Sequence, residues 1–335
     1  MDYTGKKVLV TGADGFIGSH LAEGLVQCGA NVTALALYTG QDRCGWLDDI
    51  ETKTRNQMEI VRGDVRDTAL INRLVAGKDM VFHLAALIAI PHSYVAPFSH
   101  IDVNVIGTAN ILEAARDHGT SRVIHTSTSE VYGSAQTDPI AETHPLVAQS
   151  PYAASKIAAD KLAESYALSF DLPVTTLRPF NTYGPRQSER AVIATVIRQA
   201  LDAGCDAIRI GDTSTVRDFN YVGDTVSAFL KIGTAKRLEF GRAYNSGSGS
   251  SVTIAEMIDI ILSITATNKP VVEEASRKRP EKSEVRALIA DASDLNETTG
   301  WTAGTNLETG LGKTVDWWRE RIAQGLVRGD TGYIV

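Results

Sequence analysis

Short apolar runs alternate with amphipathic segments over the first half of the chain. Runs rich in β-branched and apolar residues predict six strands, near Lys7–Thr11, Asn31–Leu37, Gln57–Arg62, Met80–Leu84, Arg122–Thr126 and Val174–Arg178. Segments of helical periodicity between them predict helices near Phe16–Cys28, Thr68–Ala76, Asn104–Asp117 and Tyr152–Phe170. Because this alternation is typical of a doubly wound parallel sheet, we expect an α/β fold of the Rossmann type.

The second half of the chain is less regular, with Gly, Ser and Pro clusters at 184–190, 246–251 and 279–282. We expect residues 1–180, with segments that return from the second half, to form a dinucleotide-binding domain. Residues 181–320 then form mainly a smaller α/β substrate-binding lobe on the same core. Residues 325–335 are expected to be a loose tail.

The composition is that of an ordinary globular protein, with 335 residues, 43% hydrophobic and 22% charged. A net charge of −7 and the lack of a long basic run argue against nucleic acid or a membrane as the main partner. No apolar run approaches the roughly 18 residues of a membrane helix. Cys28, Cys44 and Cys205 are scattered without metal-type spacing, so we expect neither disulfides nor a metal site. The polar start Met1–Lys7 carries no signal peptide, which makes a cytoplasmic protein the expectation.

A glycine-rich turn joins the first strand to the first helix, with Gly12, Gly15 and Gly18 in the string TGADGFIG. Such a turn brings backbone close to a pyrophosphate, and the helix N-terminus offers it unpaired N–H groups. The glycines alone are weak support, since glycines also occur in ordinary turns. The expected cofactor contacts of the turn are Gly12, Gly15, Phe16, Ile17 and Gly18.

The second predicted strand ends in Leu35-Ala36-Leu37-Tyr38, without the carboxylate that usually accepts the ribose hydroxyls of NAD. Arg43 comes a few residues late for a 2′-phosphate. NAD is therefore expected as cofactor, with NADP not excluded.

Further cofactor candidates follow the third and fourth strands. Asp64 could reach the adenine, although an ordinary turn aspartate is an equal interpretation. His83 is expected to be a packed, hydrogen-bonded histidine rather than a catalyst. The remaining candidates of these strand ends are Val65, Leu84, Ala85 and Ala86.

Tyr152 and Lys156 lie one helical turn apart, which places phenol and ammonium on one face. Lys156, reinforced by an oxidised nicotinamide, is expected to lower the phenol pKa from about 10, so that Tyr152 can take a hydroxyl proton as hydride leaves. The fifth strand ends in Thr128-Ser129-Glu130, at the edge where open α/β sheets bind ligands. Alone, this string could be a Ser/Thr-rich turn with a solvated Glu.

The chain resembles the extended short-chain dehydrogenase/reductase family that acts on nucleotide sugars. The resemblance rests on the three glycines, the Tyr152/Lys156 pair, and the strings 104–108 and 217–219. The longer strings at 85–91, 126–133 and 178–188, together with Gly45-Trp46-Leu47, look most like the 4,6-dehydratases of legionaminic-acid-type pathways.

The resemblance implies a reaction on a nucleotide-diphosphate sugar, expected to be a GlcNAc-type hexose. Tyr152 would oxidise C4 with help from Thr128, and Lys156 would hold the nicotinamide ribose. Glu130 would then remove the C5 proton, water would leave C6, and hydride would return there. In the dTDP-glucose branch an Asp before the Glu protonates the leaving hydroxyl, whereas this chain has Ser129. The general acid therefore stays open.

The resemblance also implies binding residues and a homodimer. Arg217 and Arg279 would grip the diphosphate, Asn181 and Arg186 would contact substrate, and Asn104 would contact the cofactor. The helices near 104–117 and 152–170 would form the dimer contact, with Ile157, Lys161 and Leu162 on its flank.

Three alternatives to the dehydratase remain open. A decarboxylase of a nucleotide-linked glucuronic acid also oxidises C4 with a Tyr/Lys pair. A 4-epimerase needs no base at C5. A non-catalytic dinucleotide sensor would commonly lose Tyr152 or Lys156, and both are present.

Overall fold

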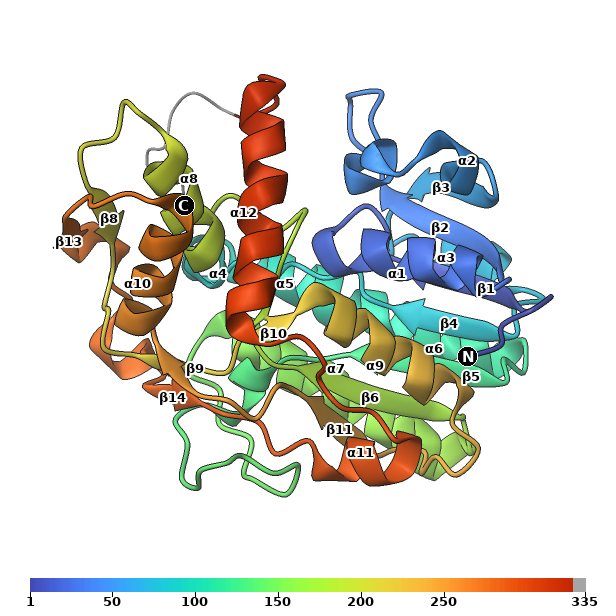
Figure 1. The fold of residues 1–335 in the computed structure, drawn as a ribbon. Helices are drawn as coiled ribbons and strands as arrows, with labels where there is room; N and C mark the ends of the chain where they lie inside the picture. Colours follow the sequence, from blue (N-terminus) through green and yellow to red (C-terminus); the bar gives the residue numbers. More distant parts are fainter. Residues whose placement is uncertain (328–335) are drawn as a thin grey trace.

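The core of the protein is a seven-stranded sheet in which every pairing is parallel (Figure 1). The structure is a computed structural model, and it describes residues 1–327. The strand order is β11-β6-β5-β4-β1-β2-β3. The strands are β1 (Lys7–Thr11), β2 (Asn31–Leu37), β3 (Met58–Gly63), β4 (Met80–His83), β5 (Arg122–Thr126), β6 (Val174–Pro179) and β11 (Ala243–Ser246). The predicted Rossmann-type fold is confirmed.

Helices cover both faces of this sheet. On one face lie α1 (Phe16–Gln27), α9 (Val222–Thr234) and α11 (Ser293–Thr299); on the other lie α3 (Thr68–Val75), α6 (Gly107–Asp117) and α7 (Pro151–Phe170). The alternation of side chains along β1 shows why: Val8 and Val10 join the core beneath α1 and α9, and Leu9 joins the core on the opposite face. Strands that are buried on both faces explain the continuous apolar runs.

Several connections between the strands of the large sheet also hold short helices. They are η1 (Gly45–Asp49), α2 (Thr52–Arg55), α4 (Ile90–Val95), α5 (Pro97–His100), the π-helix η2 (Ile101–Ile106) and the 3₁₀ helix η3 (Ser129–Tyr132). The helix expected from Asn104 therefore begins earlier, as the π-helix that runs into α6 at Gly107. Hydrophobic periodicity does not distinguish a π-helical turn from an α-helical one, so the sequence could not place this boundary.

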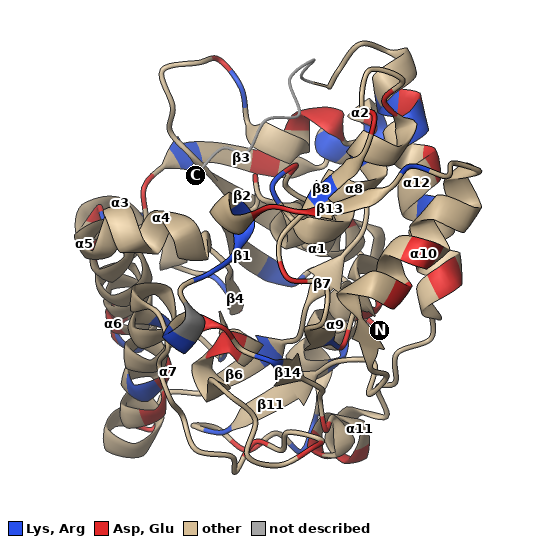
Figure 2. Cartoon of the chain, turned by 90° about the vertical axis from the view of Figure 1, so that its left-hand side faces the viewer, with Lys and Arg blue, Asp and Glu red and all other residues tan. Residues whose placement is uncertain are grey.

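The second half of the chain packs around a core of its own that includes Ile197, Ile258 and Trp318. Its elements are β7 (Thr182–Tyr183), α8 (Val192–Leu201), β8 (Ile208–Ile210), β9 (Val216–Arg217), β10 (Asn220–Tyr221), β12 (Val252–Thr253), α10 (Ile254–Thr265), β13 (Val271–Glu273), η4 (Ala275–Arg277), η5 (Glu281–Ser283), β14 (Ala287–Leu288) and α12 (Leu307–Ala323). Figure 2 shows α8, α10 and α12 gathered beside the large sheet. The division at residue 180 stays a prediction, although β11 and α9 do return to the large sheet.

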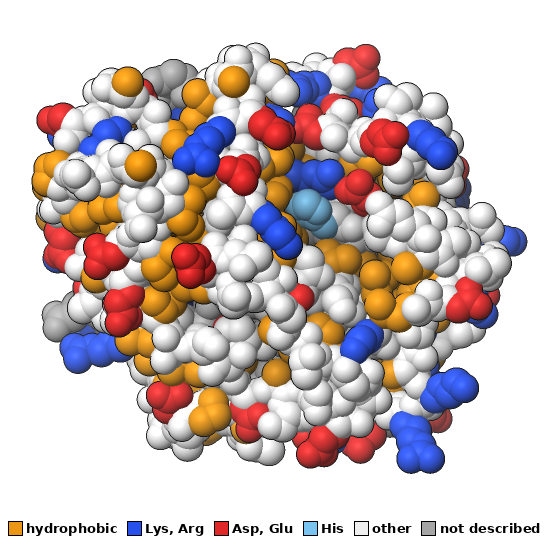
Figure 3. Space-filling view, in the orientation of Figure 1, with side chains coloured by type: hydrophobic (Ala, Val, Ile, Leu, Met, Phe, Trp, Pro, Cys, Tyr) orange, Lys and Arg blue, Asp and Glu red, His pale blue; other side chains and the backbone are white. Residues whose placement is uncertain are grey.

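Most of the expected loose tail, residues 328–335, lies outside the described residues. Within residues 1–327, no helix has the length and apolar character needed to span a bilayer. The face shown in Figure 3 mixes acidic and basic side chains without a broad basic area.

Candidate active site

A cavity of about 690 Å³ lies at the carboxyl ends of the strands, where the large sheet meets the second half of the chain. This is the edge of an open α/β sheet that binds ligands. Most of the residues singled out from the sequence line it: Gly12, Gly15, Phe16, Ile17, Gly18, Asp64, Val65, Leu84, Ala85, Ala86, Thr128, Ser129, Glu130, Tyr152, Lys156 and Asn181.

The glycine turn is packed so closely that side chains cannot enter it. Gly12 has φ +65°, and a Cβ there would lie 2.7 Å from the backbone nitrogen of Ala85. A Cβ on Gly18 would lie 2.1 Å from the carbonyl oxygen of Gly12. Helix α1 begins after Gly15 with no side-chain cap, so its first N–H groups remain available to an anion in the cavity.

Hydrogen bonds hold the end of β4 against this turn. The Thr11 hydroxyl accepts hydrogen bonds from the amides of Leu84 and Ala85, both at 3.2 Å. His83 lies between Thr11 and Thr108, with Nδ1 2.8 Å and Nε2 3.0 Å from the two hydroxyl oxygens. Burial lowers the pKa of His83 well below its ordinary value, so the ring is neutral, as a packed core histidine is.

Asn104 lies outside the cavity lining and braces a segment that belongs to it. Its buried side chain accepts a hydrogen bond from the Leu87 amide at 2.8 Å and donates to the Leu87 carbonyl oxygen at 2.9 Å. It also donates to the Ser155 hydroxyl at 2.9 Å, which ties the segment to α7. Leu87 itself lines the cavity.

Two elements bring the expected catalytic side chains together. The Ser150 hydroxyl and Pro151 start α7, which presents Tyr152 and Lys156 to the cavity. Thr128 caps η3 by accepting a hydrogen bond from the Glu130 amide at 3.3 Å. The Thr128 hydroxyl also hydrogen-bonds the Tyr152 side chain.

The expected effect of Lys156 on Tyr152 involves an oxidised nicotinamide as well, and it stays a prediction. Burial raises the pKa of Tyr152, and the hydrogen bond with Thr128 opposes this only in part. The Lys156 ammonium instead donates to the Thr126 carbonyl oxygen at 2.7 Å. Burial also lowers the pKa of Lys156 to about 8. A positive charge bound near the phenol would lower the pKa of Tyr152.

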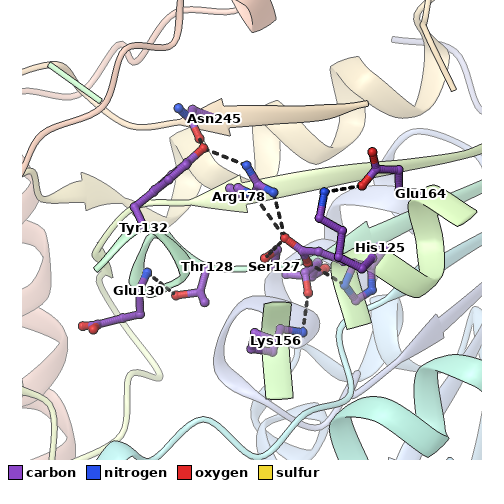
Figure 4. A network of polar contacts seen from close by, with 12 residues as sticks. His125, Ser127, Thr128, Glu130, Tyr132, Lys156, Glu164, Arg178 and Asn245 are labelled. Carbon is purple, nitrogen blue, oxygen red and sulfur yellow. Dashed lines mark hydrogen bonds and ion pairs between the residues drawn. The ribbon is translucent and has the colours of Figure 1, made fainter. Parts of the chain in front are cut away.

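A buried ionic network, which sequence reasoning missed, lies behind Lys156 (Figure 4). Asp160 accepts hydrogen bonds from Ser127 at 2.8 Å and from His125 at 3.2 Å. Arg178 donates to the same carboxylate at 3.0 and 3.1 Å. Burial alone would raise the pKa of Asp160, but these hydrogen bonds and positive charges lower it below its ordinary value. The spacing of Lys156 and Asp160, one turn apart on a helix, was the available signal.

The predicted arginines lie outside the cavity lining, and the structure describes a carboxylate partner for each. Arg279 pairs with Glu130 at 3.4 Å, and Arg217 pairs with Glu284 at 3.2 Å. The charge of Glu130 acts on both guanidinium groups. Arg186 pairs with Glu23 of α1 at 3.0 Å, away from the other two. Glu130, Arg217 and Arg279 therefore form one cluster, and Arg186 does not belong to it.

Comparison with known proteins identifies the family and supports the fold. The family model described as GDP-mannose 4,6 dehydratase matches residues 9–314. The chain belongs to the GDP-mannose 4,6 dehydratase family. It is 34% identical over 319 residues to a dTDP-glucose 4,6-dehydratase of Actinoplanes sp., and the match covers 93% of this chain and 98% of the relative. It is 35% identical over 321 residues to a UDP-glucose 4-epimerase of Mycolicibacterium smegmatis, and the match covers 94% of this chain and 99% of the relative.

Solved structures of similar proteins superpose closely on the chain. A dTDP-glucose 4,6-dehydratase of Streptomyces venezuelae, solved with NAD and TYD bound, gives a TM-score of 0.85 at 30% identity and covers 95% of this chain and 98% of its own. A UDP-N-acetylglucosamine 4-epimerase of Methanobrevibacter ruminantium gives 0.85 at 29% identity and covers 95% and 99%. Both dehydratases and 4-epimerases are therefore among the relatives.

Proposed function

We propose that this protein is an NAD-dependent 4,6-dehydratase of a nucleoside-diphosphate sugar. The observation that carries the proposal is the presence of Glu130 in the same cavity as Tyr152, Thr128 and Lys156. A dehydratase needs a base for C5 beside the group that handles the C4 hydroxyl. The Glu130 carboxylate is held by an ion pair with Arg279 at 3.4 Å.

The residues present fit a dinucleotide. Gly12 and Gly18 leave backbone where a side chain would clash, and α1 offers uncapped N–H groups beside them. Lys156, with a pKa lowered to about 8, still carries its charge at neutral pH and can hold a ribose hydroxyl. When bound, NAD would supply the hydride acceptor and a positive ring charge near the buried phenol.

The chain's own residues then divide the proton transfers. Tyr152 takes the proton of the C4 hydroxyl and Thr128 hydrogen-bonds the resulting carbonyl oxygen, while the C4 hydride would pass to bound NAD and later return to C6. The C4 ketone acidifies the C5 hydrogen, which the Glu130 carboxylate removes and a solvent proton later replaces, as the C6 hydroxyl takes up a proton and leaves as water. Ser129 is 2% exposed and lines the cavity, so it can relay that proton from Glu130 or water. The substrate we propose is a GlcNAc-type hexose, on the resemblance of the strings at 85–91, 126–133 and 178–188.

The 4-epimerase is the second candidate, because Ser129 stands where the dTDP-glucose branch carries an acid. An epimerase would change the C4 configuration without losing water. The relatives include both activities, so they do not choose between the two.

The test is incubation with UDP-linked GlcNAc in deuterated water, followed by mass spectrometry of the product. We expect loss of water and one solvent deuteron at C5. Glu130→Gln keeps the side-chain shape but removes the basicity, so C4 oxidation should proceed while elimination falls about 10²-fold or more. That variant should accumulate reduced cofactor. Product of unchanged mass, or undiminished elimination by Glu130→Gln, would overturn the dehydratase.

A further inference from the structure

The cofactor site lacks an acid at its usual place but holds one from a different segment. Strand β2 ends at Leu37, and residues 35–38 contain no carboxylate. Asp14, in the glycine turn, lines the cavity together with Leu35 and Leu37. Burial raises the pKa of the Asp14 carboxyl, and the backbone of Leu37, at the end of β2, opposes that shift by a hydrogen bond.

The backbone of Asp14 is held from two sides. The amide of the preceding residue, Ala13, donates to the Leu35 carbonyl oxygen at 3.1 Å, and the amide of Trp46 donates to the Asp14 carbonyl oxygen at 3.0 Å. Gly45 has φ +57°, and a Cβ there would lie 2.9 Å from the Cβ of Asp14. The loop after β2 therefore presses on Asp14 and restricts where its side chain can go.

Positive charges near this part of the cavity are already matched by carboxylates. Arg66 lines the cavity and pairs with Asp64 at 2.6 Å, and Arg62 pairs with Asp42 at 2.8 Å. Arg43 is not among the cavity-lining residues of the described chain. A phosphate here would meet the Asp14 carboxylate, and Arg66, the one arginine among the described lining residues, is already paired with Asp64.

We propose that the Asp14 carboxylate replaces the missing strand-end acid and makes the site select NAD over NADP. A ribose 2′-hydroxyl can donate a hydrogen bond to this carboxylate, whereas the 2′-phosphate of NADP carries negative charge and is repelled. The proposal rests on the proposed function, since it requires a dinucleotide in the cavity.

The test compares wild type with Asp14→Asn, which keeps the shape and removes the charge, and with Asp14→Glu, which keeps the charge. Nucleotide is extracted from each purified protein and identified by mass spectrometry, and dissociation constants for NAD and NADP are measured by titration. We expect wild type to contain NAD. Asp14→Asn should reduce the preference for NAD about tenfold or more, and Asp14→Glu should retain most of it.

Glu51→Gln is the matched control. Glu51 is exposed, belongs to the same connection after β2 as Gly45 and Trp46, and does not line the cavity. Its preference for NAD should equal that of wild type. Equal weakening of NAD and NADP in Asp14→Asn, or a wild type that retains NADP, would overturn this inference and leave the proposed function standing. A wild type that binds neither nucleotide would overturn both.

Discussion

Lys156 is a buried cation whose charge depends on its neighbours. Burial lowers its pKa to about 8, and the negative charge of Asp160 opposes that shift. The ammonium is therefore present below pH 8 and is lost as the pH rises through that value. If the cation is needed for turnover, the pH profile should fall near pH 8.

Asp160→Asn tests whether Asp160 positions this charge. Removing the carboxylate takes away the charge that raises the pKa of Lys156, so the falling limb of the pH profile should move to lower pH. Leaving Arg178 without its buried partner should also cost about 3–5 kcal/mol of stability. Glu164→Gln, on the exposed side of the same helix, removes the partner of Lys161. It should change neither the falling limb of the pH profile nor the stability. An unmoved limb in Asp160→Asn would assign Asp160 a purely structural role.

Tyr152→Phe isolates the phenol hydroxyl from the packing of the ring. The ring is 6% exposed, and Phe fills nearly the same volume, so folding and nucleotide content should be retained. Turnover should fall about 10²-fold or more, the scale expected on removing a positioned acid–base group. Steady-state rates and a thermal unfolding curve measure the two effects. Retained turnover would contradict the role proposed for Tyr152.

The residues of the site differ in how well the sequence could predict them. Tyr152 and Lys156 could be found because their spacing has a direct geometric meaning on a helix. The partners of Asp160 could not be found in this way. His125 lies in β5, Ser127 just follows it and Arg178 lies in β6, and a single sequence does not report the burial of these side chains. The pairing of Arg279 with Glu130 joins residues 149 positions apart in the chain.

The first turn of α7 couples local stability to the site. The Ser150 hydroxyl accepts a hydrogen bond from the Ala153 amide at 3.1 Å, and Tyr152 lies in that turn. Ser150→Ala should cost about 1 kcal/mol. It should also lower turnover, because a frayed turn displaces the phenol.

Asn306→Ala provides the control for Ser150→Ala. Asn306 caps α12 by accepting a hydrogen bond from the Thr309 amide at 2.8 Å, and it does not line the cavity. Denaturant unfolding should show a loss of about 1 kcal/mol in both variants, while only Ser150→Ala should lose turnover. Equal turnover in the two variants would show that the Ser150 cap does not contribute to the activity of the site.

Elements were predictable where burial leaves a pattern in the sequence. β1, β2 and β5 have the predicted bounds, because each is a β-branched or apolar run that is buried on both faces. β11 was missed because half of its residues, Asn245 and Ser246, are polar although fully buried. Asn245 accepts a hydrogen bond from the Tyr132 hydroxyl at 2.7 Å, so its place in the sheet depends on a tertiary partner.

The expected dimer contact stays a prediction, and two of the side chains expected on its flank are partly buried. Ile157 packs against the core cluster of Tyr132 and Phe180, and Leu162 packs against the core beneath α6 and α7. These two side chains are therefore shared between the chain's own core and its surface. The most exposed large apolar side chains are Val95 of α4 at 74%, Phe98 of α5 at 77% and Leu168 near the end of α7 at 76%.

Exposed apolar surface on these adjoining helices is the reason to expect a homodimer. Figure 2 shows α5, α6 and α7 stacked along one side of the molecule. Exposed apolar side chains on neighbouring helices are typical of an interaction site. Sedimentation should therefore show a dimer at micromolar concentration, and Phe98→Glu should shift it towards monomer by placing a charge in the contact. Val272→Glu, at a side chain 43% exposed on β13 in the second half of the chain, should leave the dimer intact. A monomeric wild type, or equal dissociation of both variants, would contradict a dimer formed through this face.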